Sequence, residues 1–501
     1  MNQGKVWLVG AGPSDAELLT VKAKRVLEQA EVVVYDRLVG DSILLMMPDT
    51  AEKIDAGKRS GNHTMPQEEM NRLLLRKAQE GKRVVRLKGG DPFLFGRGGE
   101  ELTLLAEHGI PYEVVPGVTS AIAVPAYNGI PITHRDFASG VHIITGHKRA
   151  GQEYDIDFKA LTQTKGTLVF LMGIAALEDI CKGLLAGGMD PDMPAAVLQK
   201  GTTAGQKRVV ATVGTLKEEV DRQGIETPAI IVVGKVCSLA DKFAWYEKLP
   251  LAGWKVLVTR PRQHISKTAD LLRQKGAEVL ELPSICTVPV EDNRRLYEAF
   301  EKLDTYQWII FTSPAGVEIF FDEMDRKEMD VRSLGQAKIA VIGEGTKKKL
   351  KEHHLLADFV PDVYDGDTLG AELAKELQGN EKILIPRAEA GNKKLTELLE
   401  QTGAQVDDIA TYTTRYEKSR LIDEKKELET GSVDCVVFTS ASTVKGFVEG
   451  TKGLDYTKVK AACIGKQTKA AADAYGMQTR MAKKATIESL IELVEEMKQE
   501  N

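Results

Sequence analysis

Short runs of β-branched and apolar residues alternate with longer helical stretches along the whole chain, and this alternation constrains the fold more than any other feature. The runs include VWLVGAG, VVVYD, VVRLKGGD, HIITGH, TLVFLMG and AIIVVG in the first half, and KVLVTRP, WIIFTSP, KIAVIG, KILIPR, CVVFTS and AACIG in the second. Apolar strands that alternate with helices are typical of α/β units with mainly parallel sheets buried on both faces. The sequence therefore predicts an α/β protein.

The chain of 501 residues is long enough for three or four domains at about 150 residues each. The segment SLADKFAWYEKLPLAG at 238–253 follows one predicted strand and precedes another, and Pro250 and Gly253 interrupt it. We expect a first domain over 1–240, a linker over 241–252 and a second domain over 253–501.

Composition excludes several classes of protein. The charges, 67 Lys and Arg against 73 Asp and Glu, leave a net −6, and no basic run studded with aromatic residues suggests a nucleic-acid partner. The N-terminus has no long apolar stretch, and no run approaches the roughly 18 apolar residues of a membrane span. The five cysteines form no CxxC pair, so we expect buried thiols, no structural metal and a cytoplasmic location.

The second half contains an internal repeat. Three aligned pairs are each 127 residues apart, and a fourth, in the IGxxT motif, is 122 apart. The pairs are Arg260 with Arg387, Gly276 with Gly403, Thr312-Ser313 with Thr439-Ser440, and Ile342-Gly343 with Ile464-Gly465. One supersecondary unit is therefore used twice.

Two copies of this length do not suit a solenoid, which stacks several short repeats. They suit two similar lobes that face a cleft. Ligands of parallel sheets bind outside the carboxyl ends of the strands. We therefore expect the FTS and IGxxT turns to lie at a ligand site.

In the first half, glycine-rich turns follow predicted strands. GAGPSD at 10–15 starts like a dinucleotide fingerprint, but Asp15 replaces the third glycine and Pro13 lacks a backbone N–H. VVVY ends in Asp36, which places a carboxylate at the edge of the sheet, either for chemistry or as a turn or helix cap. The fingerprint is therefore a poor match, and Asp36 is a candidate site residue.

A second glycine-rich segment, RLKGGDPFLFGRGGEE at 86–101, contains five glycines, which we attribute to the close approach of a ligand. Asp91 is placed to accept hydrogen bonds from ribose hydroxyls, and Arg97 to bind carboxylates. In PGVTSA, Thr119 or Ser120 is expected to cap a helix that runs toward Tyr127 and presents free N–H groups.

These motifs occur in one order along the chain. The series GAGPxDxxLLT, YDRLV, GKRSGNHTMPQEEMN, RLKGGDPFLFGRGGEE, PGVTSAxxxPAYxGIPITHR, TGH, GTxxxQ and PAIIVVGKV closely resembles the uroporphyrinogen-III C-methyltransferase family over about residues 4–240. One departure is Ser14, where the family usually has glycine. The resemblance implies a two-lobed tetrapyrrole-methylase-like domain.

The resemblance also implies the chemistry. Such enzymes transfer methyl groups from S-adenosylmethionine to two pyrrole carbons of uroporphyrinogen III, giving precorrin-2 for sirohaem or cobalamin. The pyrrole carbon is the nucleophile, so the protein supplies proximity, a route for proton loss and contacts to the substrate carboxylates. The positions that match cofactor contacts are Pro13, Gly89, Gly90, Asp91, Leu94, Thr119, Ser120, Met172 and Gly201.

The same resemblance suggests which residues handle protons and substrate. Asp36 matches the proposed proton acceptor, although it could instead orient the ring, and Lys58 matches the proposed proton donor. Lys58 with Arg59 could equally form a carboxylate clamp. Arg97 and Arg135 are further expected substrate contacts.

The second half resembles uroporphyrinogen-III synthase over about residues 253–495, through VTRP, FTSxxGV, AVIGxxT, the Tyr after GAQVDDIA and a second FTSxxxV. The implied fold has two α/β lobes with parallel sheets, joined by two strands. We expect lobe one to combine 253–287 with 411–501, and lobe two to span 288–410. Such synthases cyclise hydroxymethylbilane with inversion of ring D and use no cofactor.

Loss of the substrate hydroxyl needs an acid near the leaving oxygen. Tyr412 matches the family's favoured acid or positioning residue, and the alternative is a tyrosine that only packs against pyrrole. Side chains at the strand ends are expected to hold the acetate and propionate groups. They are Arg260, Thr312, Ser313, Thr439, Ser440, Lys466 and Thr468.

An alternative function keeps methyl transfer but changes the tetrapyrrole substrate, with the second half as a non-catalytic ligand-binding regulatory module. Cyclisation of hydroxymethylbilane distinguishes the two, because a regulatory module binds a tetrapyrrole without turnover. We expect small tetrapyrrole partners and a homodimer formed through the methyltransferase domain, as the first resemblance implies.

Overall fold

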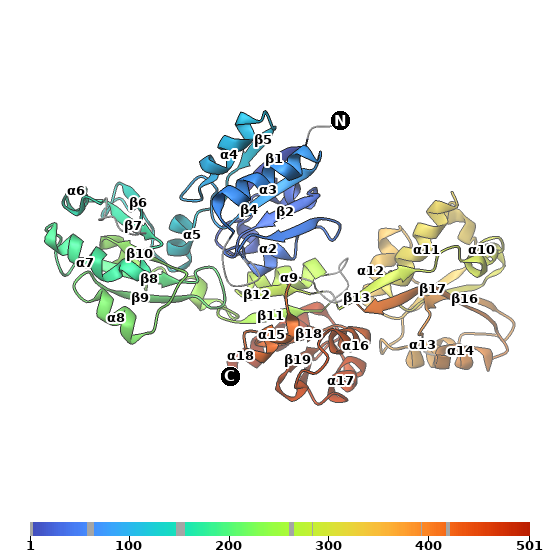
Figure 1. Ribbon diagram of the computed structural model, residues 1–501. Coiled ribbons are helices and arrows are strands. Elements are labelled where there is room, and N and C mark those ends of the chain that lie inside the picture. Colours follow the sequence, from blue (N-terminus) through green and yellow to red (C-terminus); the bar gives the residue numbers. More distant parts are fainter. Residues whose placement is uncertain are drawn as a thin grey trace.

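The computed structural model describes residues 4–57, 65–146, 156–259, 265–282, 284–391, 393–416 and 421–500. Within these ranges the chain forms four five-stranded sheets, two in each half, with helices packed against them (Figure 1). We name the units lobe A and lobe B in the first half, and keep lobe one and lobe two for the second. This arrangement confirms the predicted α/β class.

Lobe A has a fully parallel sheet in the order β3-β2-β4-β1-β5. Its strands are β1 (Lys5–Gly10), β2 (Val32–Tyr35), β3 (Glu52–Asp55), β4 (Arg83–Lys88) and β5 (Tyr112–Val115). Its helices are α1 (Val21–Glu28), α2 (Asp41–Leu44), α3 (Gln67–Gln79) and α4 (Gly98–Glu107). From here α5 (Ser120–Tyr127) leads to lobe B and packs against its sheet.

Lobe B departs from the mainly parallel pattern. Its sheet has the order β6-β7-β10-β8-β9, and only β6 and β7 pair in parallel. The strands are β6 (Val141–Thr145), β7 (Thr167–Leu171), β8 (Pro194–Gln199), β9 (Lys207–Thr212) and β10 (Ala229–Val233); the helices are α6 (Phe158–Gln163), α7 (Leu177–Ala186) and α8 (Leu216–Arg222). The turn 200–206 joins β8 to β9 directly, and a connection this short forces antiparallel pairing.

Lobe one has a fully parallel sheet in the order β12-β11-β18-β19-β20. Its strands are β11 (Lys255–Val258), β12 (Glu278–Glu281), β18 (Cys435–Phe438), β19 (Lys460–Cys463) and β20 (Gln478–Met481). Its helices are α9 (Ile265–Gln274), α15 (Glu424–Glu429), α16 (Ala441–Gly450), α17 (Lys466–Asp473) and α18 (Ile487–Gln499).

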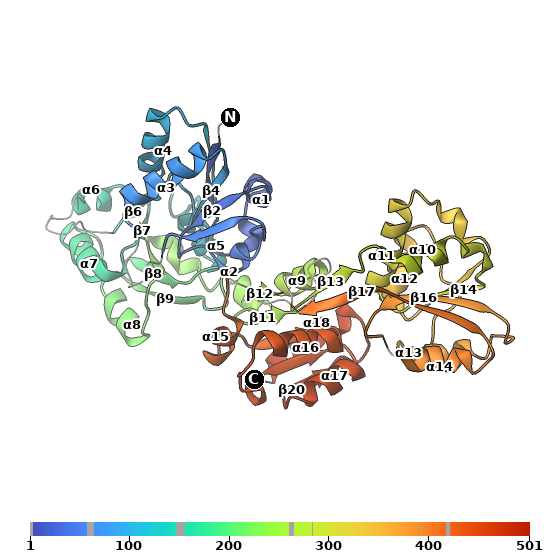
Figure 2. The same cartoon turned by 45° about the vertical axis from the view of Figure 1, so that its right-hand side comes forward.

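Lobe two has the sheet order β13-β17-β16-β14-β15, parallel except for the pair β13 and β17. Its strands are β13 (Ile285–Pro289), β14 (Trp308–Phe311), β15 (Lys338–Val341), β16 (Lys382–Ala388) and β17 (Gln405–Tyr416). Its helices are α10 (Arg294–Phe300), α11 (Pro314–Arg326), α12 (Glu344–Glu352), α13 (Gly366–Leu373) and α14 (Lys393–Glu400). The antiparallel strands β13 and β17 extend toward lobe one (Figure 2). They cross the expected lobe boundaries at 287 and 411, and we count them with lobe two because they pair within its sheet.

Short 3-10 helices occur in several connections. They are η1 (Ala16–Leu18), η2 (Ile174–Ala176), η3 (Lys235–Leu239), η4 (Tyr246–Lys248), η6 (Leu303–Thr305), η7 (Val331–Leu334) and η8 (Tyr456–Lys458).

The two copies of the repeat exchange their halves between the lobes. β11 and β12 open the first copy and share a sheet with β18 and β19, which close the second. β16 and β17 open the second copy and share a sheet with β14 and β15, which close the first. The strand orders β12-β11-β18-β19 and β17-β16-β14-β15 correspond one to one. Gly276 and Gly403 have nearly the same positive φ, 92° and 95°, in the turns before β12 and β17.

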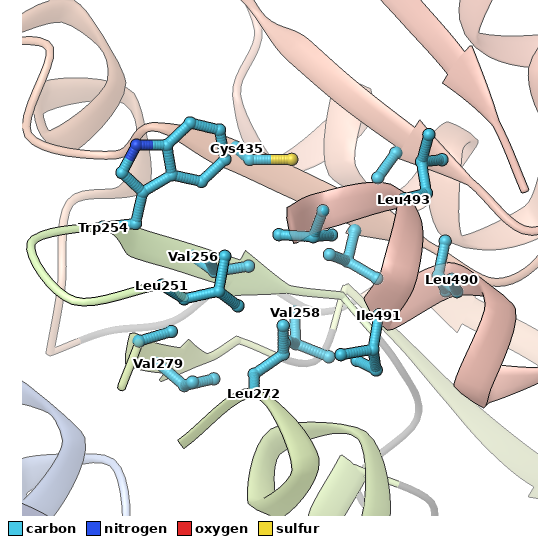
Figure 3. Close-up of a cluster of buried hydrophobic side chains, with 14 of the residues drawn as sticks. Leu251, Trp254, Val256, Val258, Leu272, Val279, Cys435, Leu490, Ile491 and Leu493 are labelled. Atoms are coloured by element: carbon cyan, nitrogen blue, oxygen red, sulfur yellow. The ribbon is translucent and has the colours of Figure 1, made fainter. Parts of the chain in front are cut away.

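Each sheet is buried on both faces. In lobe A, Val84 and Val85 are neighbours in β4 but belong to different apolar clusters, because successive side chains point to opposite faces. In lobe one, side chains of β11, β18, α9 and α18 form one such cluster, which Leu251 and Trp254 also join (Figure 3). Burial on both faces leaves the ends of the strands for polar chemistry.

The segment 241–252 is folded against both halves. Trp245 Nε1 donates to the carbonyl of Ala126 at 2.9 Å on the side of the first half. Tyr246 donates to the carbonyl of Gly276 at 3.2 Å, and the amide of Leu251 to Lys275 at 2.8 Å, both in lobe one. The expected linker is therefore a packed junction; the domain boundaries themselves stay predictions.

Two further features concern the described part of the chain as a whole. Cys181, Cys237, Cys435 and Cys463 are buried thiols, and burial raises the pKa of Cys181 to about 11. None of the helices in the described ranges is long and apolar enough to cross a membrane.

We predict that Gly276→Ala destabilises lobe one by about 2 kcal/mol, measured by thermal denaturation. A Cβ at Gly276 would lie 2.7 Å from Cβ of Leu249, in addition to the strain of a positive φ. Gly431→Ala is the control, since Gly431 has a φ of +69° but no described atom within 4 Å of an added Cβ. Equal stability of the Gly276 variant and wild type would contradict the prediction.

Candidate active sites

One cavity of about 1180 Å³ opens where lobe A, lobe B and lobe one meet. It lies beyond the carboxyl ends of β1, β2 and β4, where ligands of parallel sheets bind. All nine positions predicted to contact the cofactor line it, together with Asp36 and Arg97. The nine are Pro13, Gly89, Gly90, Asp91, Leu94, Thr119, Ser120, Met172 and Gly201.

Asp36 belongs to a buried ion network on the cavity wall. Its Oδ1 accepts a hydrogen bond from Nη2 of Arg86, whose side chain is 4% exposed. Glu101, which is fully buried, accepts from Arg86 Nε at 3.2 Å and from Lys88 Nζ at 2.8 Å. Lys88 Nζ is also 4.0 Å from Oδ2 of Asp36. Two cations and two carboxylates therefore hold one another in place.

The sequence analysis did not select Arg86, Lys88 or Glu101. The signal was present in VVRLK, because a central parallel strand is normally apolar and two cations inside it are unusual. Such cations need buried partners, which the GGEE motif supplies through Glu101. The pairing itself joins residues from two elements, so it was visible only in the tertiary structure.

The network fixes the position of Asp36 at the cavity. Burial, followed by the neighbouring Arg86 guanidinium, lowers the pKa of Lys88. Arg86 holds Asp36 with one oxygen engaged, which leaves the carboxylate oriented at the cavity edge. Asp36 is thus placed to accept a proton or to orient a ring, and both predicted roles remain.

Asp91 fixes the loops around the cavity. Its Oδ1 accepts from the amides of Phe93 and Leu94 at 2.8 and 3.1 Å, and its Oδ2 accepts from the amide of Gly117 at 3.0 Å. The carboxylate therefore ties the loop after β4 to the segment before α5. Its predicted contact with ribose hydroxyls stays a prediction.

The capping prediction for α5 is confirmed. Thr119 is the N-cap, and its hydroxyl accepts from the amide of Ala121 at 3.3 Å. The helix runs from Ser120 to Tyr127 as expected. Thr119 and Ser120 line the cavity at the start of this helix, where the positive end of the helix dipole favours polar or anionic ligand groups.

Two of the five glycines in the segment 86–101 have a different cause from the ligand contact that we expected. A Cβ at Gly89 would lie 2.9 Å from Cβ of Leu38, and one at Gly98 would lie 2.5 Å from the carbonyl oxygen of Pro92. Packing within the protein, rather than approach of a ligand, therefore requires glycine at these two positions.

Gly90 differs from these two glycines, and it supports the predicted cofactor. It has a φ of +69°, and the nearest described neighbour of an added Cβ is the amide nitrogen of Ser120, 4.0 Å away. An added Cβ would therefore occupy cavity space between the loop after β4 and the start of α5. The residues present fit a small ligand held closely against the main chain.

Backbone strain is concentrated at this cavity. Six of the ten described non-glycine residues with positive φ line it: Ser14, Phe95, Arg97, Met172, Lys200 and Thr202. Strain of this kind clusters at ligand sites, where the surrounding structure enforces it. The φ of 107° at Ser14 explains why glycine is usual at that position in the resembling family.

Of the predicted substrate-binding cations of the first half that the structure describes, one lines the cavity and one does not. Arg97 lines the cavity and pairs with Glu100 through a bidentate contact. Arg135 is exposed and is not among the residues that line the cavity. Lys58 and Arg59, like Arg260 in the second half, lie outside the described residues.

In lobe two, the structure brings Tyr412 and Ser313 together. Their hydroxyl oxygens are 2.7 Å apart, and the Tyr412 side chain is only 7% exposed. Burial raises the pKa of Tyr412 above its ordinary value, although the hydrogen bond to Ser313 opposes the shift. The phenol therefore stays protonated at neutral pH, and the raised pKa makes it a weaker acid than an exposed tyrosine. Thr312 is half-buried beside this pair.

In lobe one, the corresponding residues end β18 and β19. Ser440 caps α16 by accepting from the amide of Thr443 at 3.2 Å, as Ser313 caps α11. Thr439 is half-buried, Lys466 is exposed at the start of α17, and Thr468 is buried in the same turn. Both serines thus have a structural role in capping, and the predicted contacts to substrate carboxylates stay predictions.

Comparisons with known proteins agree with the two family resemblances. The family Tetrapyrrole (Corrin/Porphyrin) Methylases matches residues 5–217, and the family Uroporphyrinogen-III synthase HemD matches residues 266–492. The "Porphyrin biosynthesis protein HemD" of Ruminiclostridium josui is 48% identical over 492 residues, which are 98% of each chain. The chain belongs to the family that joins a tetrapyrrole methylase to a uroporphyrinogen-III synthase. Lobes A and B form its methylase domain, and lobes one and two its synthase domain.

Two further relatives cover the methylase domain. The "Uroporphyrinogen-III C-methyltransferase" of Bacillus subtilis is 39% identical over 378 residues, 75% of this chain and 77% of the relative. The crystal structure of uroporphyrin-III C-methyl transferase from Thermus thermophilus complexed with S-adenyl homocysteine is 42% identical. It covers 47% of this chain and 99% of that chain, with a TM-score of 0.41.

We predict that Glu101→Gln lowers the free energy of unfolding of the methylase domain by about 3 kcal/mol, because it leaves two buried cations short of one counter-charge. Urea denaturation measures the loss. Glu100→Gln is the matched control. Because Glu100 is exposed, we expect this substitution to change the free energy of unfolding by no more than about 0.5 kcal/mol. Similar losses in the two variants would argue against a buried network.

Proposed function

We propose that the two domains catalyse consecutive reactions. The synthase domain cyclises hydroxymethylbilane to uroporphyrinogen III with inversion of ring D. The methylase domain then transfers two methyl groups to this product, giving precorrin-2 for sirohaem or cobalamin. The observation that carries the proposal is the single cavity in which all nine predicted cofactor positions meet Asp36.

S-adenosylmethionine, when bound, supplies an electrophilic methyl group. The cavity walls around Gly90 and the first turn of α5 are suited to hold the donor against the main chain. In each transfer a pyrrole carbon forms the new C–C bond, the sulfur–methyl bond breaks, and the pyrrole loses a proton. Asp36, oriented by Arg86, is placed to accept that proton or to orient the ring.

In the synthase domain the substrate hydroxyl leaves as water, which needs a proton at the leaving oxygen. Tyr412, hydrogen-bonded to Ser313, is the proposed donor or positioning residue. Ring closure then needs a cleft that keeps the chain folded and excludes competing water. No cofactor takes part in this proposed step.

The experiment gives the full-length protein hydroxymethylbilane with and without S-adenosylmethionine. We expect type III uroporphyrinogen without the donor and a dimethylated product with it, identified by isomer analysis and absorption. Asp36→Asn should slow methylation about 100-fold and spare cyclisation, and Tyr412→Phe should do the reverse. Formation of the type I isomer alone would refute the synthase function, and equal loss of both activities in either variant would refute the division between domains.

The proposal includes a cytoplasmic location and a homodimer through the methylase domain, which follows from the family resemblance. Light scattering of the purified protein should give twice the chain mass of 54.9 kDa. A mass equal to one chain would exclude the dimer and leave the two activities unaffected.

A further inference from the structure

The synthase domain supplies part of the wall of the methylase cavity. Lobe one contributes residues from the end of α9, from the start of β11, from the turn and strand at β12, and from the segment before β18. They are Lys255, Arg273, Gly276, Ala277, Glu278, Val279, Gly431, Ser432 and Asp434. Both views show α2 of lobe A against β12 (Figures 1 and 2).

Two of these residues connect lobe A to lobe B. Lys255 and Glu278 face each other at the starts of β11 and β12, with Nζ and Oε1 3.3 Å apart. Lys255 Nζ is also 3.5 Å from Oδ2 of Asp41, the first residue of α2 in lobe A. Glu278 Oε2 accepts from the amide of Ala204 at 2.8 Å, in the β8–β9 turn of lobe B. The series of polar contacts Asp41–Lys255–Glu278–Ala204, called the contact chain below, therefore links lobe A to lobe B by way of two residues of the synthase domain.

The surroundings of Lys255 and Glu278 strengthen the ion pair between them. The side chains of Lys255 and Glu278 are only 13% and 20% exposed. Burial lowers the pKa of Lys255, but the carboxylates of Glu278, Glu427 and Asp41 outweigh burial, so the pKa is raised overall. Lys255 therefore remains charged, and partial burial weakens screening by salt.

Both ends of the contact chain reach segments that carry predicted cofactor residues. Ala204 lies in the same turn as Gly201, and the hydroxyl of Thr202 in that turn donates to the carbonyl of Pro13 at 2.7 Å. On the other side, Asp41 begins the helix that follows Leu38, and Leu38 packs against Gly89. A displacement of lobe one would therefore move two opposite walls of the cofactor cavity.

We propose that Lys255 and Glu278 of the synthase domain are positioning residues of the methyltransferase. They set the spacing of lobes A and B that binds the methyl donor, so the affinity for donor depends on docking of the synthase domain. This inference rests on the proposed function. In this role both residues act through the methylase lobes and not on the reacting atoms.

Isothermal calorimetry with S-adenosylhomocysteine on the full-length protein tests the proposal. Asp41→Asn and Glu278→Gln each keep the side-chain shape and remove one charge of the contact chain. We expect each to weaken binding about threefold to fivefold, the range for a partly exposed ion pair. The KM for the donor should rise by the same factor, with kcat for methylation and the rate of cyclisation within about twofold of wild type.

The double variant separates positioning from direct contact, because Asp41 and Glu278 both line the cavity. If Asp41 and Glu278 act through the same contact chain, removing both charges should reduce the affinity no more than removing one. The double variant should then bind S-adenosylhomocysteine as tightly as the weaker of the two single variants. Multiplied losses would overturn the proposal in favour of independent contacts. Glu488→Gln is the control, because it breaks the Lys267–Glu488 pair elsewhere on lobe one.

The outcomes distinguish the inference from the proposed function. Wild-type protein that cyclises hydroxymethylbilane but binds no S-adenosylhomocysteine refutes the methyltransferase, and the inference with it. Wild-type binding that both variants retain unchanged overturns the inference alone. Reduced cyclisation in the single variants would show damage to lobe one itself and would also count against a positioning role.

Discussion

Burial of the sheets on both faces is the constraint on which the rest of this structure depends. Covered sheets leave polar chemistry only at strand ends, and the carboxyl ends of parallel strands gather at one edge. Asp36 after β2, Gly89 and Gly90 after β4, and Ser313 after β14 all occupy such ends. The exception is β4, where Arg86 and Lys88 lie inside a buried strand and require Glu101 as a partner.

That exception has a physical reason. Isolated buried charges are costly, but charges that pair with one another hold a fixed geometry in a medium where their interaction is strong. The network keeps Asp36 in place without relying on a flexible surface side chain. A preorganised carboxylate of this kind needs little reorganisation when a substrate arrives.

The synthase domain uses a different device, the exchange of halves between two repeats. Each lobe combines the opening strands of one copy with the closing strands of the other, so neither copy completes a sheet alone. The exchange makes β13 and β17 the connection between lobes and places Tyr412 on β17, opposite Ser313 at the end of β14. The side of lobe one that does not connect to lobe two packs against the methylase domain.

Much of this organisation could be predicted from local sequence. Periodic apolar runs determine the α/β class, the repeat of 127 residues determines the twin lobes, and Thr119 determines the start of α5, because each depends on residues close together in the chain or on direct self-similarity. The glycines at 89 and 98 were attributed to a ligand because their packing partners come from other elements. For the same reason, only the tertiary structure decided the antiparallel pairing in lobe B, the Arg86–Glu101–Lys88 network and the contact of Lys255 and Glu278 with both methylase lobes. Contacts between distant segments depend on how whole sheets pack, and no local pattern encodes that packing.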